Sequence, residues 1–478
     1  MANQVPKSKK NAIEIDKGNP FKNCKLGREK YAQVLTSIVQ NYSDGFVLAI
    51  NNEWGTGKTT FIKMWEQHLK NEKFTTLHFN AWKTDFSSNP FIALISQLGM
   101  LKKSKVDKVY KGFLEKSVIF IKKLGPGLLK GLAKKHIDDS ELLNLIKVGA
   151  EITADDLEKR MKKQLEVESD IDDFRTALKN LVGKASSDKP IVFIIDELDR
   201  CRPDYAVAVL EQIKHFFAID GIVFVLAIDK EQLGHAVRGV YGSDKINADE
   251  YLRRFIDLEY SIPDPEYKDY CAYLYDYFKF DEFLASEKRM VSELSKEKNH
   301  FINFASSFFS KNKLTLRLLE KIFFRARIAM NLFKESEYTF PGVYIYLLYL
   351  KFSEEDFYKN IIDKKLTINE LAAKIEKNID FKQTDNDLYF FLFTESCLLS
   401  FYRNYYNKNT PRDSYIEWLL NSDGELQFKS GLEKEQLIDG LVRNISFISQ
   451  NNYSDLSLSH LINKIELTEN FVSTDTEK

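Results

Sequence analysis

The sequence FVLAINNEWGTGKTT, residues 46–60, decides the fold of this chain. Its first part, residues 46–50, is an apolar run that favours a buried β-strand, because it is too short for a helix. A glycine-containing loop follows and ends in Lys58 and Thr59, and a helical pattern continues over residues 61–70. Strand, glycine-containing loop, Lys-Thr and helix are the parts of a phosphate-binding loop, or P-loop.

The chemistry of a P-loop depends on these residue types. Glycines let backbone N–H groups turn inward around phosphate oxygens, and the helix N-terminus adds a partial positive charge. We expect Lys58 to reach the β- and γ-phosphates of a nucleotide and the Thr59 hydroxyl to bind Mg²⁺. The residues expected to line the nucleotide are Glu53, Trp54, Gly55, Thr56, Gly57, Lys58, Thr59 and Thr60.

One position departs from the G-x-x-x-x-G-K-[ST] pattern, because Asn52 replaces its first glycine. Asparagine is among the few residues that tolerate the left-handed backbone conformation. On this basis we expect the asparagine to serve in place of the glycine. The alternative is a fortuitous match in an ordinary loop, and the sequence downstream disfavours it.

The second decisive stretch is IVFIIDELDR, residues 191–200. Five apolar residues followed by Asp196 and Glu197 are typical of a Walker B strand, which brings a carboxylate to the edge of the sheet beside the P-loop. We expect Asp196 to hold Mg²⁺ through water. Glu197 is expected to orient or deprotonate the water that attacks the nucleotide.

Three further apolar segments complete a predicted sheet. Residues 75–82 alternate as a strand does, residues 222–228 form a buried strand, and a fifth strand ends at Pro263. Helical patterns separate these strands, which predicts an α/β fold with a parallel sheet covered on both faces and a ligand at its carboxyl edge. Asp229 follows the fourth strand, where related NTPases keep a polar residue that senses the γ-phosphate.

Two arginines, Arg253 and Arg254, end a short helical pattern just before the fifth strand. One interpretation is an arginine finger that acts on a neighbouring subunit. The other is a pair of charges favoured by the dipole at the end of a helix. The sequence does not decide between them.

The segment of residues 101–136 carries eleven lysines and only two acids. Apolar residues recur in it at helical spacing, and Gly-Pro-Gly at residues 125–127 is expected to split it into a helical hairpin. Such a hairpin suits a membrane surface or nucleic acid. The alternative is a solvated lysine face that the acid-rich residues 137–185 neutralise.

The whole chain is balanced in charge, with 69 basic and 70 acidic residues among 478, so its net charge indicates no partner. Four scattered cysteines indicate neither a zinc site nor a disulfide framework, and they favour a reducing cytoplasm. No apolar run is long enough to span a bilayer. Attachment to the periphery of a membrane stays open.

The order of these patterns suggests four regions. We expect a disordered arm over residues 1–19 and a nucleotide-binding domain over residues 20–262, with a helical insertion at about 101–185. From about residue 264 the pattern is helical and rich in aromatic residues, with helices over 267–284 and 287–311. A helical lid is therefore expected over residues 263–335, and a C-terminal helical domain over residues 336–478.

Taken together, these residues resemble the KAP family of P-loop NTPases, a branch of the additional-strand class related to AAA+ ATPases. The resemblance covers roughly residues 20–330. Its matching segments are LGR at 26–28, NEWGTGKTT at 52–60, FNAW at 79–82, IIDELDRCRPD at 194–204, VFVLAIDK at 223–230 and YLRRFIDLEYSIP at 251–263. Many relatives carry transmembrane helices between the Walker motifs, whereas this chain carries its lysine-rich segment there.

The resemblance implies binding and hydrolysis of ATP with Mg²⁺, and a conformational change passed to the helical region. It adds Leu26, Gly27 and Arg28 to the expected nucleotide site, and Arg317 as a sensor of the γ-phosphate. It also implies a homo-oligomer, a protein partner of the helical domains and a role in bacterial defence against phages.

Three functional hypotheses stay open at this stage. The first is an ATPase whose nucleotide cycle drives conformational change or assembly. The second is a nucleotide-loaded switch that hydrolyses ATP slowly and recruits an effector. The third is a motor on nucleic acid that uses residues 101–136, although no helicase motif accompanies those lysines.

Overall fold

The computed structural model describes residues 14–468 apart from 87–88, 102–105, 130–153, 187, 265, 380–384, 409, 412–413, 452 and 454. The chain divides into two compact units, and the boundary follows Asp264. The first unit contains the predicted nucleotide-binding domain. The division of the second unit into a lid and a separate C-terminal domain stays a prediction, as does the arm at residues 1–19, of which 1–13 lie outside the described residues.

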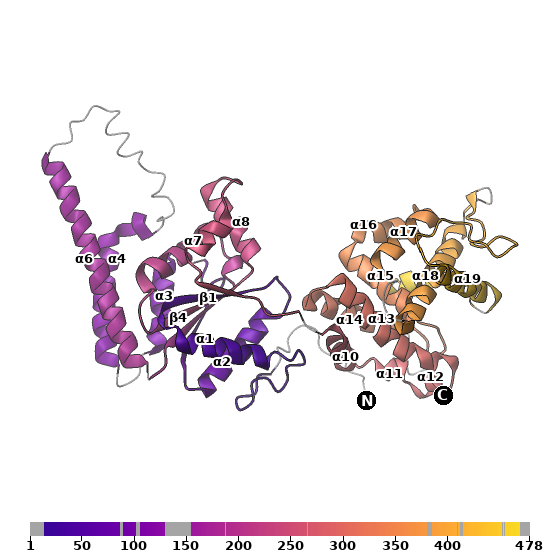
Figure 1. The fold of residues 1–478 in the computed structure, drawn as a ribbon, viewed down its shortest axis with the longest axis horizontal. Coiled ribbons are helices and arrows are strands. Elements are labelled where there is room, and N and C mark those ends of the chain that lie inside the picture. Colours follow the sequence, from indigo (N-terminus) through magenta and orange to yellow (C-terminus); the bar gives the residue numbers. More distant parts are fainter. Residues whose placement is uncertain are drawn as a thin grey trace. The chain divides into compact units, whose positions relative to one another are not determined.

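The first unit is built on a five-stranded sheet in which all strand pairs are parallel (Figure 1). Its strands are β1 (Asp44–Asn51), β2 (Thr75–Asn80), β3 (Ile191–Asp196), β4 (Ile222–Ile228) and β5 (Leu258–Tyr260). The spatial order is β2-β3-β4-β1-β5, so β4 separates the P-loop strand from the Walker B strand. The predicted α/β fold class is confirmed. The fifth strand is shorter than expected and ends three residues before Pro263.

Helices cover both faces of this sheet because the central strands are apolar on both sides. Along β3, Phe193 and Ile195 belong to one hydrophobic core, whereas Val192 and Ile194 belong to the other. The second of these cores contains α1 (Glu29–Asn41) and α2 (Lys58–Asn71). The first contains α3 (Pro90–Leu98), α4 (Asp107–Leu129), α6 (Ala154–Ala185), α7 (Pro203–Gln212), the π-helical turn Ile213–Phe217, α8 (Lys230–Tyr241) and α9 (Ala248–Arg253).

The lysine-rich insertion forms part of a long helix pair, in which α4 packs against α6 (Figure 1). The backbone of α4 stays helical through residues 125–127, so the predicted break at Gly-Pro-Gly is wrong. Lys116 of α4 forms an ion pair with Asp173 of α6 (2.5 Å), which agrees with partial neutralisation of the lysines by acids. The lysines of residues 102–105 and 130–136 lie outside the described residues.

The second unit is helical in its described part. Its main helices are α10 (Tyr267–Tyr277), α11 (Asp281–Leu284), α12 (Glu287–Met290), α13 (Glu297–Asn312), α14 (Leu316–Met330), α15 (Pro341–Ser353), α16 (Glu355–Ile362), α17 (Ile368–Asn378), α18 (Asp385–Asn407), α19 (Glu435–Gln450) and α20 (Ser459–Glu466). The expected helix over 267–284 is interrupted at Lys279, whose φ of 56° is left-handed. In the described part of the chain, no helix is long and apolar enough to cross a membrane.

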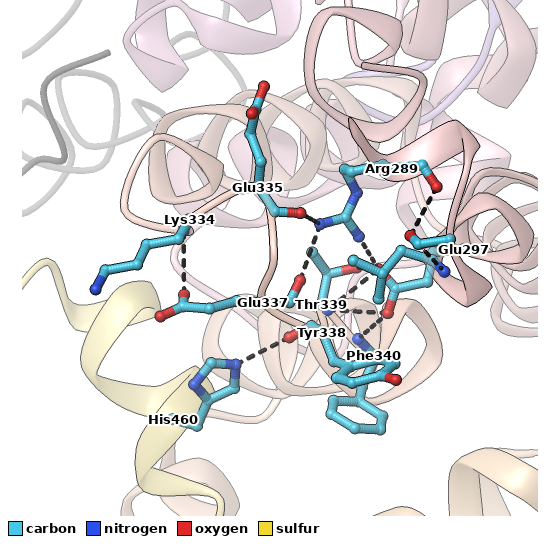
Figure 2. Close-up of polar contacts among 11 residues, drawn as sticks. Arg289, Glu297, Lys334, Glu335, Glu337, Tyr338, Thr339, Phe340 and His460 are labelled. Atoms are coloured by element: carbon cyan, nitrogen blue, oxygen red, sulfur yellow. Dashed lines mark hydrogen bonds and ion pairs between the residues drawn. The ribbon is translucent and has the colours of Figure 1, made fainter. Parts of the chain in front are cut away.

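A buried ion pair fastens the turn between α14 and α15 (Figure 2). Arg289 is fully buried, and its guanidinium donates to the carbonyls of Glu335 (3.0 Å) and Glu337 (2.8 Å) and pairs with the Glu297 carboxylate. The same carboxylate accepts hydrogen bonds from the backbone N–H groups of Thr339 (2.9 Å) and Phe340 (3.0 Å). The two buried charges thus pair with each other, and both also form hydrogen bonds with the backbone of the turn.

We expect Glu297→Gln to destabilise this turn strongly. The substitution keeps the shape of the side chain but leaves the Arg289 charge buried without a counter-ion, a change that costs about 3–5 kcal/mol. Hydrogen exchange at the amides of Thr339 and Phe340, measured on the full chain, should accelerate accordingly. Glu355→Gln, which removes an exposed pair with Lys359, is the control and should leave exchange nearly unchanged. Equal protection in the two variants would contradict this account.

Candidate nucleotide-binding site

The candidate site lies at the carboxyl edge of the sheet, where the ends of β1, β2, β3 and β4 meet. The register pairs Asn80 with Asp196 and Asn51 with Ile228, so the residues that follow these strands are brought together. The P-loop connects β1 to α2. Gly55 (φ 89°) and Gly57 (φ 82°) adopt the left-handed conformation that side chains disfavour, which lets the loop turn its N–H groups toward a phosphate.

Asn52 acts differently from the prediction. It is not among the described residues with positive φ, so the argument from left-handed tolerance is wrong. Its side chain instead bonds the backbone of Ile262 twice: Nδ2 donates to the carbonyl (2.8 Å) and Oδ1 accepts from the N–H (3.0 Å). A glycine has no side chain to make these bonds. The asparagine therefore fastens the start of the P-loop to the chain that leaves β5.

Lys58 is buried at the start of α2, and its ammonium donates to the carbonyl of Asn52 (2.6 Å). Burial lowers the pKa of Lys58, whereas the charges of Asp199, Asp229 and Asp196 act to raise it. A desolvated cation surrounded by acids can exchange its carbonyl contact for the stronger charge-assisted bonds that a phosphate offers.

Thr59 and Asp196, the two residues predicted to bind Mg²⁺, lie next to each other. The Thr59 hydroxyl donates to Asp196 Oδ1 at 3.5 Å, and Asp196 is 1% exposed. Burial raises the pKa of Asp196, and the charge of Glu197 raises it further. Within the described chain Asp196 Oδ2 has no hydrogen-bond partner. A buried carboxylate oxygen without a donor, next to a hydroxyl, fits a hard divalent cation.

Glu197 follows Asp196 in a left-handed conformation (φ 62°), and both of its carboxylate oxygens are occupied. Asn80 Nδ2 donates to Oε2 (2.7 Å), and Arg200 Nη1 pairs with Oε1 (2.8 Å). Left-handed backbone at a residue other than glycine is costly and is concentrated at functional sites. The backbone conformation at the end of β3 thus sets the direction of this side chain, and Asn80 and Arg200 hold its carboxylate in place.

Trp54 and Asp229 are connected through Asp199, which lies two residues after Glu197. Asp199 Oδ2 accepts from the indole Nε1 of Trp54 and from the backbone N–H of Asp229 (3.1 Å). Asp229 Oδ2 accepts in turn from the backbone N–H of Trp54 (3.2 Å), and Oδ1 caps α8. The P-loop, the Walker B segment and the end of β4 therefore form one hydrogen-bonded unit. Asp229 lies at the predicted place, and its role as a γ-phosphate sensor stays a prediction.

Arg28 lies behind the P-loop. It is 4% exposed, and its guanidinium donates to the carbonyls of Thr56 (2.8 Å) and Gly57 (3.4 Å). This cation braces the loop through its carbonyls and leaves the loop N–H groups for a ligand. Leu26 and Gly27 lead into this arginine, and their part in nucleotide binding stays a prediction.

The remaining predicted residues fall into two groups. Glu53, Thr56 and Thr60 belong to the loop and the first turn of α2, and the Thr56 hydroxyl donates to the carbonyl of Glu53 (2.9 Å). Arg253 and Arg254 are exposed at the end of α9 and make no side-chain bond to another described residue. Arg317 is exposed in the first turn of α14, in the second unit, so its sensor role stays a prediction.

Sequence reasoning missed three residues that contact the predicted ones: Asn80, Asp199 and Arg200. The sequence did contain a signal for Asn80. The strand at residues 75–80 ends in this polar residue, at the edge of the sheet where parallel strands place a ligand. The other two belong to the LDRC segment after the Walker B acids.

The sheet order and the carboxyl-edge site define a P-loop NTPase fold of the kind in which one strand separates the two Walker strands. The comparison with known families agrees: the model of the KAP family P-loop domain matches residues 28–329, more than half of the chain. This chain belongs to the KAP family, and its P-loop domain is a nucleotide-binding domain. The predicted family is thereby confirmed.

Among curated proteins, the chain is similar to the phage T7 exclusion protein of Escherichia coli (strain K12). The two sequences are 23% identical over 232 residues, which is 46% of this chain. The match spans 30% of the length of that protein, so most of the relative has no counterpart in the alignment.

Proposed function

We propose that this protein binds ATP with Mg²⁺ and hydrolyses it, and that the nucleotide cycle drives conformational change or assembly through the helical unit. The observation that carries the proposal is the acid pair at the end of β3. Asp196 is buried beside the P-loop hydroxyl of Thr59, and Glu197 is held at the same edge by Asn80 and Arg200. A binding module without catalysis needs the first acid and not the second.

Each residue has a distinct task in this proposal. Lys58 leaves the Asn52 carbonyl and binds the β- and γ-phosphates, while the P-loop N–H groups surround them. Thr59 and Asp196 hold Mg²⁺, which neutralises phosphate charge when it is bound. Glu197 orients the attacking water and accepts its proton. The developing negative charge on the γ-phosphate is stabilised by the Lys58 ammonium.

The contacts of Glu197 also support the slow switch as a second candidate. Each carboxylate oxygen already accepts one bond, from Asn80 or from Arg200, so these two neighbours restrict how far the carboxylate can turn toward a water. Basal hydrolysis is then slow until a ligand or partner shifts these contacts. No observation favours the nucleic-acid motor over these two.

We expect Asn80→Ala to raise basal ATP hydrolysis several-fold without a change in the Kd for ATP. The substitution frees Glu197 Oε2 and leaves the P-loop contacts untouched. Phosphate release measured on wild type and variant gives the result. Thr76→Ala, on the same strand, is the control, because the Thr76 hydroxyl donates to Glu66 (3.4 Å) and has no hydrogen bond to Asp196 or Glu197. If turnover falls while the Kd for ATP is unchanged, Asn80 does not restrain Glu197. Asn80 would then be a residue that positions Glu197 as the general base.

Assembly into a homo-oligomer is proposed from the exposure of Arg253 and Arg254, which lie at the end of α9 and form no ion pair with a described residue. If Arg254 acts on the ATP of a neighbouring subunit, Arg254→Ala loses hydrolysis but keeps ATP binding. Mixing this variant with Lys58→Ala should then restore part of the activity, because each supplies what the other lacks. Arg238→Ala, on the neighbouring helix α8, is the control. No recovery on mixing would contradict action between subunits.

A role in defence against phages, with partner proteins, is proposed from the name of the bacterial relative, the phage T7 exclusion protein. That name describes the other protein, and fold does not determine biological role. Phage plating on cells that carry wild type or Glu197→Gln tests the role: equal plating on both and on cells without the gene would refute it.

A further inference from the structure

The helical unit contains a cavity of about 620 Å³, separate from the nucleotide-binding domain. It lies among the end of α18, the residues around Tyr415 and the start of α20. Its volume falls in the range of small-molecule sites, about 300–1,000 Å³. Its lining is polar for the most part, and it includes two cationic side chains, Arg403 and Lys408, against one carboxylate, Asp455.

Arg403 is the most informative residue of this lining. It is half-buried and makes no ion pair with a described residue, and burial lowers the pKa of its guanidinium. Its Nε donates to the carbonyl of Glu417 (2.9 Å), and Nη1 donates to Asn404 Oδ1 (3.2 Å). Since a guanidinium has five N–H groups, three remain for another acceptor. An arginine withdrawn from water without a counter-ion is poised to bind an anion.

The surroundings hold this guanidinium in place. The ring of Trp418 lies 3.8 Å from the guanidinium carbon, and the Asn404 amide donates to the carbonyl of Leu456 (2.6 Å). A fixed, planar fork loses little freedom when it binds an acid group. Lys408, which is exposed and makes no ion pair with a described residue, adds a second positive charge at the cavity.

Another residue of the lining is tied to the fastened turn described above. His460 lines the cavity, and its Nε2 is 2.9 Å from the carbonyl of Tyr338 (Figure 2). Tyr338 immediately precedes Thr339 and Phe340, which the buried Glu297 carboxylate holds. Hydrogen bonds thus hold Arg403 and His460 in place, which lowers the cost of ordering these side chains when a ligand binds.

We infer that this cavity binds a small organic anion, whose phosphate or carboxylate group is held by Arg403 with the help of Lys408. The volume of about 620 Å³ leaves room for an organic body beside the acid group. The half-exposed ring of Tyr415 in the lining offers that body an apolar surface. The helical unit thereby gains a ligand site of its own.

The test uses the full chain carrying Lys58→Ala, which removes phosphate binding at the P-loop. Phenyl phosphate, benzoate and the neutral benzyl alcohol are titrated separately, and binding is followed by ligand-observed NMR. We expect one of the two anions to bind in preference to the alcohol, and the stronger of them identifies the acid group. Failure of both anions to bind, or equal binding of the alcohol, would overturn the inference.

Two substitutions locate the binding. Arg403→Gln should weaken it about tenfold or more, because charge-assisted hydrogen bonds are lost. Lys408→Gln should weaken it by a smaller factor, and it disturbs no side-chain hydrogen bond of the described chain. Arg443→Gln, an exposed arginine of α19 outside the lining, is the matched control. The inference is refuted if Arg403→Gln and Lys408→Gln both bind the anion as tightly as the parent chain does. It is also refuted if Arg443→Gln weakens binding as much as they do.

Discussion

Lys58→Ala is expected to abolish measurable ATP hydrolysis and to weaken nucleotide binding by roughly 30-fold to several thousand-fold. The Lys58 ammonium is buried, and among the described residues it donates to one carbonyl, that of Asn52, which a phosphate oxygen can replace. Removal of one partner from a buried, hydrogen-bonded charge pair costs about 2–5 kcal/mol, which gives this range of Kd. Equilibrium titration with a fluorescent ATP analogue measures the loss.

The matched control is Lys63→Ala, which removes an exposed lysine from the same helix and should leave binding unchanged. The fold is expected to survive in both variants, since Lys58 donates its hydrogen bond to a loop carbonyl and packs in no apolar core. Wild-type affinity in Lys58→Ala would mean that the nucleotide does not contact this lysine.

Glu197→Gln is expected to retain ATP and to stop turning it over. The amide is nearly isosteric and keeps an acceptor for Asn80, but it cannot take a proton from water. Loss of a general base lowers the rate by about 10²–10⁴-fold. Rapid-quench measurement of a single turnover separates this loss from any change in nucleotide release.

The same variant reports on assembly. If ATP drives assembly, light scattering should find Glu197→Gln in the larger state at ATP concentrations where wild type cycles between states. Asp204→Asn, an exposed acid at the start of α7, is the control for the change in charge. If Glu197→Gln has the same single-turnover rate as wild type, Glu197 is not the general base. The proposed role of the acid pair in hydrolysis would then be wrong.

The features that the sequence predicted are those with strong local signals. The strands β1, β3 and β4 are apolar runs of the length that a covered parallel sheet requires, and the P-loop carries its chemistry in consecutive residues. The order of the segments along the chain then determines which strand ends meet. For these reasons the fold class and the position of Lys58, Thr59 and Asp196 followed from the sequence.

The features that the sequence did not predict depend on contacts between distant residues. Asn52 bonds Ile262, which lies 210 positions away, and Asn80 bonds Glu197, which lies 117 positions away. No local pattern marks either pair. In the same way, α4 continues through residues 125–127, although the local propensity of Gly-Pro-Gly favours a break.

ATP hydrolysis by the purified chain tests the central claim most directly. Phosphate release is measured for wild type with ATP and Mg²⁺, and Lys58→Ala, prepared in parallel, supplies the background. The account predicts a rate for wild type that clearly exceeds this background, and a rate for Asn80→Ala that is higher still. If both are no faster than Lys58→Ala while wild type binds ATP, the chain has no ATPase activity of its own, and the enzyme proposal is wrong.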